Sequence, residues 1–218
     1  MTAPASDDRP LVAVLDYGIG NLRSAQKALE KMGADARLTD DHELVEEADG
    51  VVLPGVGAFG ACMDALREAG LDQPAAEAVA CGRPFLGICV GMQMLFDGSE
   101  EDTTARGLGV IPGTIQWIPE GVKRPQMQWN QLRLRRQDDP MFRELGDAPW
   151  VYFVHSLHGV PDDPSVVAAT CEYGSELNAA FRVDNVFATQ FHPEKSGTDG
   201  LHLLRNFVES IVLRERAA

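Results

Sequence analysis

The stretch Phe85-Leu86-Gly87-Ile88-Cys89-Val90-Gly91-Met92-Gln93 decides the fold, because it places a cysteine between two glycines where one sequence pattern changes into another. An apolar run, typical of a buried strand, leads into Cys89, and a run of helical character over residues 90–96 follows it. This spacing is typical of a nucleophile elbow with sulfur in place of the serine hydroxyl. The glycines permit the sharp turn because side chains there would collide with the neighbouring backbone. We therefore expect Cys89 at the carboxyl end of a strand and the amino end of a helix.

A thiol in that position is suited to nucleophilic catalysis, since the positive end of a helix dipole favours the reactive thiolate. A second segment, Gln190-Phe191-His192-Pro193-Glu194, also follows an apolar, strand-like run. Histidine is the natural base for a cysteine nucleophile, and a carboxylate can fix the tautomer of its imidazole. An arbitrary cysteine and histidine would be read as a buried residue and a loop residue. The elbow and the His-Pro-Glu triplet together instead predict a catalytic triad of Cys89, His192 and Glu194.

The composition is that of a soluble enzyme with one domain. The chain has 218 residues, 44% of them hydrophobic, enough for a sizeable core. A net charge of −14 argues against nucleic acid or an anionic membrane as the main partner. The four cysteines show no disulfide-framework spacing, which favours a cytoplasmic location, and no apolar run approaches transmembrane length. No residue cluster has zinc spacing and no P-loop sequence is present, so we expect neither a metal nor a cofactor.

Strand-like and helical patterns alternate along the chain, which predicts an α/β domain with a mostly parallel central sheet and helices on both faces. Residues 1–10 are polar and are expected to form a flexible tail, and residues 11–218 to form a single domain. Asn21 is the expected cap of a first helix that Gly33 ends, and residues 199–215 the closing helix. The expected strands are 11–16, 51–53, 85–88, 114–118, 132–135, 151–154, 166–171, 179–183 and 186–190.

Two glycine-rich loops follow expected strands. Gly18-Ile19-Gly20 partly matches a dinucleotide fingerprint, but Arg23 stands at the third glycine position, so a tight turn that packs a helix on the sheet is favoured. Pro54-Gly55-Val56-Gly57 is a candidate oxyanion loop, in which backbone amides stabilise the charge of a tetrahedral intermediate. One amide is expected from Val90, directly after the nucleophile. From the residues alone, an ordinary turn at 54–57 is nearly as well supported.

These segments carry a family resemblance. The chain resembles class-I (triad-type) glutamine amidotransferases and, more narrowly, the family of glutaminase subunits of imidazole glycerol phosphate synthase, from histidine biosynthesis. Met92, the Pro-Gly-Val-Gly loop and the lysine after Glu194 favour the narrower family. The resemblance runs from about residue 11 to the closing helix, and its marks are the segments 16–22, 54–60, 87–93, 107–113, 152–156 and 190–197.

The resemblance implies a single-domain, three-layer, flavodoxin-like fold and the hydrolysis of L-glutamine to glutamate and ammonia through a cysteine thioester. It implies that the ammonia passes to a separate (β/α)8 cyclase subunit, which makes imidazole glycerol phosphate and the purine precursor AICAR. It also makes Val56 the second oxyanion donor. The residues that it assigns to glutamine binding are Gly57, Gln93 and Ser156, and those that it assigns to the partner face are Asn21, Trp129 and Lys195.

Two alternatives stay open at this point: the glutaminase of another amidotransferase, such as pyridoxal phosphate synthase, and a degenerate binding subunit. The chain also departs from the family pattern at two positions, since Gln128 replaces a glycine and Leu157 stands where an aromatic residue is commoner. His155 and His158 have no carboxylate at a triad-like spacing, so we interpret them as structural or surface residues. The acidic run over residues 100–102 is expected to be a solvated loop.

Overall fold

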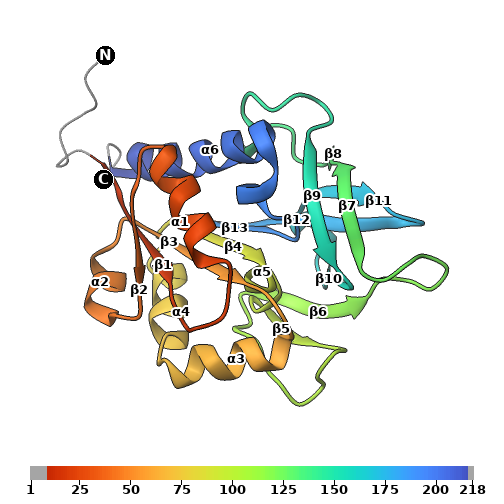
Figure 1. The fold of residues 1–218 in the computed structure, drawn as a ribbon, viewed down its shortest axis with the longest axis horizontal. Coiled ribbons are helices and arrows are strands. Elements are labelled where there is room, and N and C mark those ends of the chain that lie inside the picture. Colours follow the sequence, from red (N-terminus) through yellow and green to blue (C-terminus); the bar gives the residue numbers. More distant parts are fainter. Residues whose placement is uncertain (1–8, 216–218) are drawn as a thin grey trace.

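The computed structural model describes residues 9–215, so most of the expected tail lies outside the described residues. A mixed eight-stranded sheet of order β2-β1-β3-β4-β13-β12-β11-β8 forms the centre of the molecule (Figure 1). Its strands are β1 (Leu11–Leu15), β2 (Asp35–Thr39), β3 (Gly50–Gly55), β4 (Phe85–Cys89), β8 (Arg133–Leu134), β11 (Val167–Glu172), β12 (Glu176–Val183) and β13 (Val186–Thr189). The helices are α1 (Leu22–Lys31), α2 (His42–Glu47), α3 (Phe59–Glu68), α4 (Asp72–Ala80), α5 (Val90–Gln93) and α6 (Gly197–Glu215).

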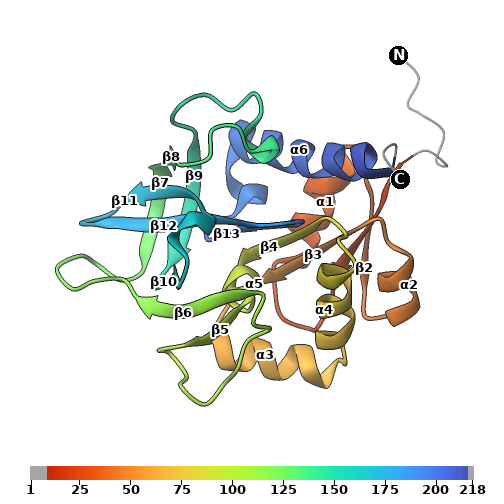
Figure 2. The ribbon, with the colours of Figure 1, turned by 180° about the vertical axis from the view of Figure 1, so that it is seen from behind.

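The five strands β2, β1, β3, β4 and β13 run parallel to one another. The inner strands β3 and β4 are buried along their whole length, which explains their nearly continuous apolar sequences. Helices α1 and α6 cover one face of this part of the sheet and α3 and α4 cover the other, as Figures 1 and 2 show from opposite sides. The α/β fold with a mostly parallel sheet and helices on both faces is therefore confirmed.

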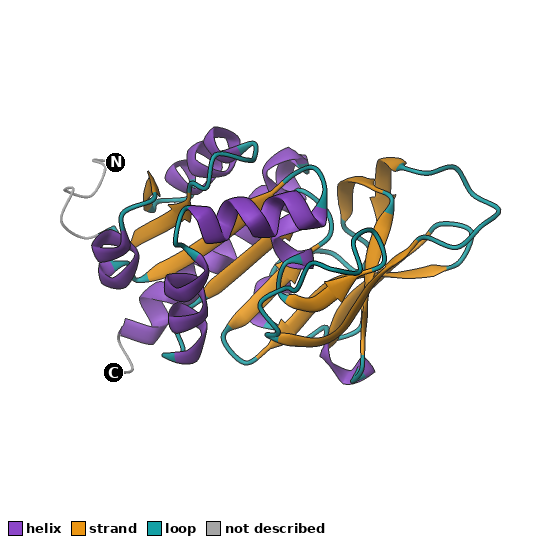
Figure 3. Cartoon of the chain, turned by 90° about the horizontal axis from the view of Figure 1, so that it is seen from below, coloured by secondary structure: helices purple, strands orange, loops and turns teal. Residues whose placement is uncertain are grey.

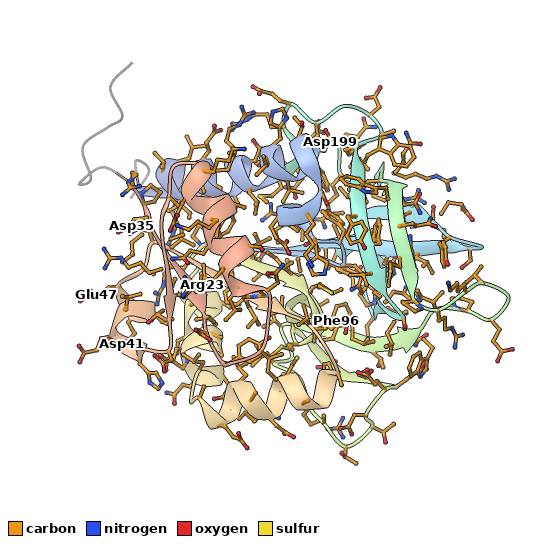
Figure 4. The ribbon with its side chains drawn as sticks, viewed as in Figure 1. Arg23, Asp35, Asp41, Glu47, Phe96 and Asp199 are labelled. Carbon is orange, nitrogen blue, oxygen red and sulfur yellow. The ribbon has the colours of Figure 1, made fainter. Side chains whose placement is uncertain are left out.

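The second half of the chain adds a strand-rich region beside the helical one, which Figure 3 shows from below. Here β12, β11 and β8 continue the central sheet in antiparallel fashion. Two smaller sheets lie next to it, one of β5 (Phe96–Ser99), β6 (Ile111–Trp117) and β10 (Leu157–Pro161), the other of β7 (Gln126–Gln131) and β9 (Trp150–His155). Phe96, labelled in Figure 4, is fully buried and meets the ring of Phe181 edge-on at 5.2 Å, so a shared core joins β5 to the central sheet.

The register of the parallel strands brings distant segments to one edge of the sheet. Gly55 at the end of β3 is paired with Cys89 at the end of β4, and Thr189 of β13 is paired with Ile88. The candidate oxyanion loop begins with the last two residues of β3, the elbow cysteine is the last residue of β4, and the His-Pro-Glu segment follows β13. Ligand sites of open α/β sheets lie at this carboxyl edge, so the fold assembles the candidate site from three separate motifs.

Several sequence predictions need correction. The helical run expected over residues 90–96 is wrong beyond Gln93, because α5 ends there and Phe96 begins strand β5. Short apolar runs fit a helix and a strand equally well, which explains the error. Asn21 stands at the start of α1, but its side chain bonds to the Ser24 hydroxyl and to no helix N–H, so it does not cap the helix as expected. No helix within residues 9–215 is long and apolar enough to cross a bilayer.

Candidate active site

Cys89 occupies a strained turn between β4 and α5. Its φ of 56° lies in the left-handed region, which is unfavourable for a residue with a side chain, and such strain is frequent at functional sites. The turn requires glycine at position 91, since a Cβ there would lie 1.8 Å from the carbonyl oxygen of Leu53 on the neighbouring strand. A Cβ on Gly87 would lie 3.0 Å from the Cα of Met92. The local geometry is that of a nucleophile elbow, although α5 has only four residues and so a smaller dipole than the longer helix we expected.

His192 and Glu194 form a buried pair beside this elbow. His192 Nδ1 lies 2.8 Å from Glu194 Oε1, and the two side chains are only 2% and 3% exposed. Nδ1 therefore donates to the carboxylate, and Nε2 is the nitrogen left for Cys89. Burial opposes the charged imidazolium, but the neighbouring Cys89 and Glu194 outweigh it and raise the pKa of His192 to about 9, although His192 Nε2 has no hydrogen-bond partner among the described residues. The structure thus brings the three predicted triad residues together and favours a protonated His192 at neutral pH.

A pocket of about 250 Å³ opens over the cysteine, a size that suits a small metabolite. The predicted oxyanion residues Val56 and Val90 line it, as do all three predicted glutamine-binding residues, Gly57, Gln93 and Ser156. Leu157, one of the two departures from the family pattern, also lines the pocket, and its carbonyl oxygen lies 3.5 Å from Gln93 Nε2. The sequence-based selection of pocket residues therefore converges on a single cavity, while their roles in binding stay predictions.

The candidate oxyanion loop is held by two side chains that the sequence reading did not assign. Tyr17 donates its hydroxyl proton to the Pro54 carbonyl oxygen at 2.6 Å, and Cys62 Sγ lies 3.2 Å from the carbonyl oxygen of Val56. Burial raises the pKa of both groups, that of Cys62 to about 11, so both stay protonated donors. The Gly55–Val56 peptide lies between these two fixed carbonyls. A Cβ on Gly55 would approach Gly91 N to 2.7 Å, so only glycine fits there.

His155 and His158 are both buried, in agreement with a structural role. His155 Nδ1 donates to the Leu157 carbonyl oxygen at 2.7 Å, and Nε2 pairs with the side-chain amide of Gln126 at 2.9 Å. Burial lowers the pKa of His155 to about 4, so its ring is neutral at pH 7. Although His155 lines the pocket, both of its nitrogens are occupied, and it is not free to act as the base.

Sequence reasoning missed Glu101. The acidic run over residues 100–102 is expected to be solvated, and Glu100 and Glu101 are indeed exposed, but both also make contacts that were not expected. Glu101 accepts the N–H of Phe59, the first residue of α3, at 2.7 Å and lines the pocket, and Glu100 accepts the N–H of Trp117 at 2.9 Å. These contacts join residues far apart in sequence, so no local pattern indicates them. The pocket consequently has a carboxylate at its wall.

The three predicted partner residues lie around the segment that carries His192. Asn21 is exposed and lines a small cavity together with His192 and Glu194. Trp129 is 47% exposed on β7, and Lys195 directly follows Glu194 and is half-buried. Asp199 of α6, labelled in Figure 4, accepts the N–H of Trp150 at 2.7 Å and ties β9 to this region. The ring of Trp129 lies 6.0 Å from that of Tyr152, whose carbonyl oxygen accepts the N–H of His192, so all three residues lie near the triad.

Gln128, the second departure from the family pattern, does not disturb the backbone. It lies in the middle of β7, whose ladder with β9 runs without a register shift from Gln126 opposite His155 to Gln131 opposite Trp150. Within residues 9–215 there is also no group of three or more His, Cys, Asp or Glu side chains arranged to hold a metal ion.

The family model for class-I glutamine amidotransferases matches residues 13–211. Solved structures share the fold: a glutamine amidotransferase (TM-score 0.73, 24% identity, 92% of this chain and 98% of that one) and PurLQS from Thermotoga maritima (TM-score 0.75, 23% identity, 93% and 99%).

Curated relatives are much closer in sequence. The imidazole glycerol phosphate synthase subunit HisH of Geobacter sulfurreducens is 51% identical over 205 residues, which cover 91% of this chain and 98% of the relative. The subunit of the same name from Synechococcus elongatus is 49% identical over 205 residues, covering 93% and 94%. The chain therefore belongs to the class-I glutamine amidotransferase family and, within it, to the HisH subunits of imidazole glycerol phosphate synthase.

Proposed function

We propose that this chain is the glutaminase subunit of an imidazole glycerol phosphate synthase. It hydrolyses L-glutamine to glutamate and ammonia and supplies the ammonia to a cyclase subunit, which makes imidazole glycerol phosphate and AICAR. The observation that carries the proposal is Cys89, with its strained backbone, beside the buried His192–Glu194 pair. Cys89 and His192 line a pocket sized for a small metabolite. The identity of about 50% to HisH subunits over nine-tenths of the chain supports this choice over the glutaminase of another amidotransferase.

The chemistry proceeds from the state in which the Cys89 proton is already on His192 Nε2, in keeping with the raised pKa of His192. The sulfur then attacks the carboxamide carbon of glutamine, and the amides of Val90 and Val56 stabilise the oxyanion that forms. His192 returns its proton to the nitrogen as the C–N bond breaks, so ammonia leaves and a glutamyl thioester stays on Cys89. Water, deprotonated by His192, adds to the thioester, and glutamate and the free thiol are released. Glu194 holds the imidazole in orientation throughout and stabilises its charged form.

The pocket walls supply groups that match the rest of glutamine. The carboxylate of Glu101 is a counter-charge for the α-ammonium group, since one of its oxygens already accepts a backbone N–H and the other is free to accept from a ligand. Gln93 is a hydrogen-bonding group near the carboxamide, and Gly57 and Ser156 complete the binding site. With this carboxylate at the wall, we expect the pocket to prefer an amino acid over a simple amide.

The partner is a (β/α)8 cyclase subunit, and it docks on the surface around Asn21, Trp129 and Lys195. Met127 and Trp129 project from the same face of β7 and are 62% and 47% exposed. Exposed aromatic side chains and Met next to a lysine are the residue types enriched in protein–protein interfaces. This surface adjoins the triad, so the path of ammonia from the triad to the partner is short.

All four cysteines are free, which supports a cytoplasmic location.

Cys89→Ala tests the proposal in the complex with the cyclase subunit. Glutamine-dependent synthesis should disappear, because no other group forms the thioester, while synthesis from added ammonium salt continues. Cys81→Ala is the matched control: Cys81 is exposed, and its sulfur accepts a hydrogen bond from Arg83 Nε at 3.2 Å, so it is the strongest competitor for an electrophile. This variant should keep full activity. Labelling of Cys81, Cys62 or Cys171 in place of Cys89 by an electrophilic glutamine analogue would show that the assignment is wrong.

A further inference from the structure

Gln190 is a buried polar residue with no role in the chemistry described so far. It stands between strand β13 and His192, and its side chain is fully buried. Its backbone N–H already donates to the carbonyl oxygen of Ala179, so the side-chain amide is not needed to complete the sheet. A buried amide is costly unless it is hydrogen-bonded, and an apolar side chain would fill the same space without that cost. We therefore ask which groups of the active site the side-chain amide of Gln190 contacts.

The two ends of the Gln190 amide connect the nucleophile to a pocket residue. Its Nε2 lies 3.9 Å from Cys89 Sγ, within reach of a hydrogen bond to sulfur. Its Oε1 accepts from Gln93 Nε2 at 3.1 Å. Gln93 Nε2 also points at the Leu157 carbonyl oxygen, 3.5 Å away. Cys89, Gln190 and Gln93 thus form a continuous chain of hydrogen-bonding groups, from the reacting sulfur to the wall of the glutamine pocket.

The direction of this chain is fixed at both ends. A thiolate and a backbone carbonyl can only accept hydrogen bonds, so Gln190 must present its NH₂ group to the sulfur and Gln93 must present its NH₂ group to Leu157. With its NH₂ at the sulfur, Gln190 has its oxygen toward Gln93. Gln93 consequently keeps its own Oε1 for the pocket, and this oxygen has no hydrogen-bond partner within residues 9–215. A substrate N–H can bind an oxygen there, whereas the carboxylate of glutamate would be repelled by it.

We propose that Gln190 is a positioning residue that donates a hydrogen bond to the Cys89 thiolate and turns the Gln93 carbonyl oxygen toward the N–H groups of glutamine. The inference rests on the proposed glutaminase function and assigns to Gln190 two effects, one on the nucleophile and one on substrate recognition. Without the donor, the thiolate is less stable relative to the thiol. Without the Gln190 oxygen as acceptor, the Gln93 side-chain amide is free to turn over. In part of the protein molecules its NH₂ group then faces the N–H groups of glutamine, which cannot accept a hydrogen bond.

The test compares Gln190→Met and Gln190→Leu with the wild-type complex. Both substitutions remove the hydrogen bonds, and methionine keeps the length and unbranched shape of glutamine, so at least this variant is expected to fold. The pH of half-maximal alkylation of Cys89 by iodoacetamide should rise by about 0.5 to 1 pH unit. The KM for glutamine should rise by about tenfold, the worth of one well-formed hydrogen bond. Thermal unfolding reports whether each variant is folded.

Two further variants separate positioning from a merely structural role. Asn206→Leu removes another buried amide, which bonds the carbonyl oxygens of Met141 and Arg143 and lies outside the pocket. It should lower stability but leave the alkylation profile and KM unchanged. In a Gln93→Leu background, Gln190→Met should still shift the alkylation profile but should raise KM no further, because its effect on the substrate runs through Gln93.

Failure of the inference and failure of the proposed function are distinguishable. Folded Gln190→Met with wild-type KM and an unchanged alkylation profile would overturn the positioning role alone. A KM effect of the same size with and without Gln93 would also overturn it, since substrate recognition would then not pass through that residue. A wild-type complex that hydrolyses no glutamine, or whose Cys89 does not react, would instead refute the proposed function itself.

Discussion

The His192–Glu194 pair makes a graded prediction about three variants. The rise in the pKa of His192 from 6.5 to about 9 corresponds to roughly 3 kcal/mol in favour of the imidazolium. Cys89 and Glu194 share that stabilisation, so loss of the Glu194 charge alone should remove about 1 to 2 kcal/mol, or roughly 5- to 30-fold in rate. Both side chains are almost fully buried, so little of this is screened by solvent. Loss of His192 removes both proton transfers and should cost about 100- to 10,000-fold.

Two variants of Glu194 separate the effect of its charge from the effect of its hydrogen bond to His192. Glu194→Gln keeps an oxygen that can accept from His192 Nδ1, 2.8 Å away in the wild type, but it removes the charge. Glu194→Ala removes the charge and the orientation together. The expected order of remaining activity is therefore wild type, Glu194→Gln, Glu194→Ala and His192→Ala. In Glu194→Gln the alkaline limb of the pH–rate profile should also move to lower pH, because the imidazolium loses a proton more easily without the carboxylate.

The assay is the initial rate of glutamate formation in the complex with the cyclase subunit, measured at saturating glutamine from pH 6 to pH 10. Ammonia-dependent synthesis by the same preparations is the control, and it should be equal in all of them because the cyclase is untouched. Wild-type activity of His192→Ala would refute the triad. Equal losses in Glu194→Ala and His192→Ala would refute the division of roles between base and orienting carboxylate.

Three further predictions concern the residues that support the site. In the folded protein His155 has a pKa of about 4 and stays neutral, while in the unfolded chain it takes up a proton below pH 6.5. The free energy of unfolding should therefore fall by up to about 3 kcal/mol as the pH drops from 6.5 to 4. Urea titrations of His155→Gln should lack this part of the pH dependence. Gly91→Ala should destabilise the fold by about 3 kcal/mol or more, because its Cβ would lie 1.8 Å from a backbone oxygen, whereas Gly146→Ala, where no atom lies within 4 Å, should be neutral in thermal unfolding; equal stability of the two would contradict the elbow geometry. Tyr17→Phe should cost about 1 kcal/mol of stability and lower kcat, while the rate of Cys89 alkylation, which needs no oxyanion donor, should be unchanged.

The buried parallel strands were predictable because one signal, an unbroken apolar run, determines them. Residues 11–16 and 85–88 contain most of β1 and β4, and residues 51–53 are the central half of β3. By contrast, β2 and β7 were missed. Strand β2 lies at the edge of the sheet and carries Asp35 and Arg37, and β7 exposes four of its six residues, so neither shows the pattern of a buried strand. Their pairing with β1 and β9 is a tertiary effect that overrides local preference.

The residues of the candidate site likewise fall into two groups, those that the sequence reveals and those that it does not. Cys89, His192 and Glu194 belong to short motifs whose residues are close in sequence, so their spacing reveals them. Glu101 and Tyr17 act across 42 and 37 residues of chain, on the N–H of Phe59 and the carbonyl of Pro54. A lone tyrosine and a member of an acidic run have no local spacing that distinguishes them from surface residues. Contacts of this kind become visible only when the sheet register has placed the two segments together.

The close packing at the elbow also explains how a single peptide could control the site. A Cβ on Gly55 would meet Gly91 N at 2.7 Å and the Tyr17 hydroxyl at 2.8 Å, so β3 and the elbow are in contact without side chains between them. On either side of the Gly55–Val56 peptide, the carbonyls of Pro54 and Val56 are held by Tyr17 and Cys62. Because these carbonyls are held, we expect any rotation of the loop to be confined to the one peptide whose N–H is the proposed oxyanion donor. A partner that biases this peptide would change the rate by the worth of one donor, about 100- to 1,000-fold, while the triad stays in place.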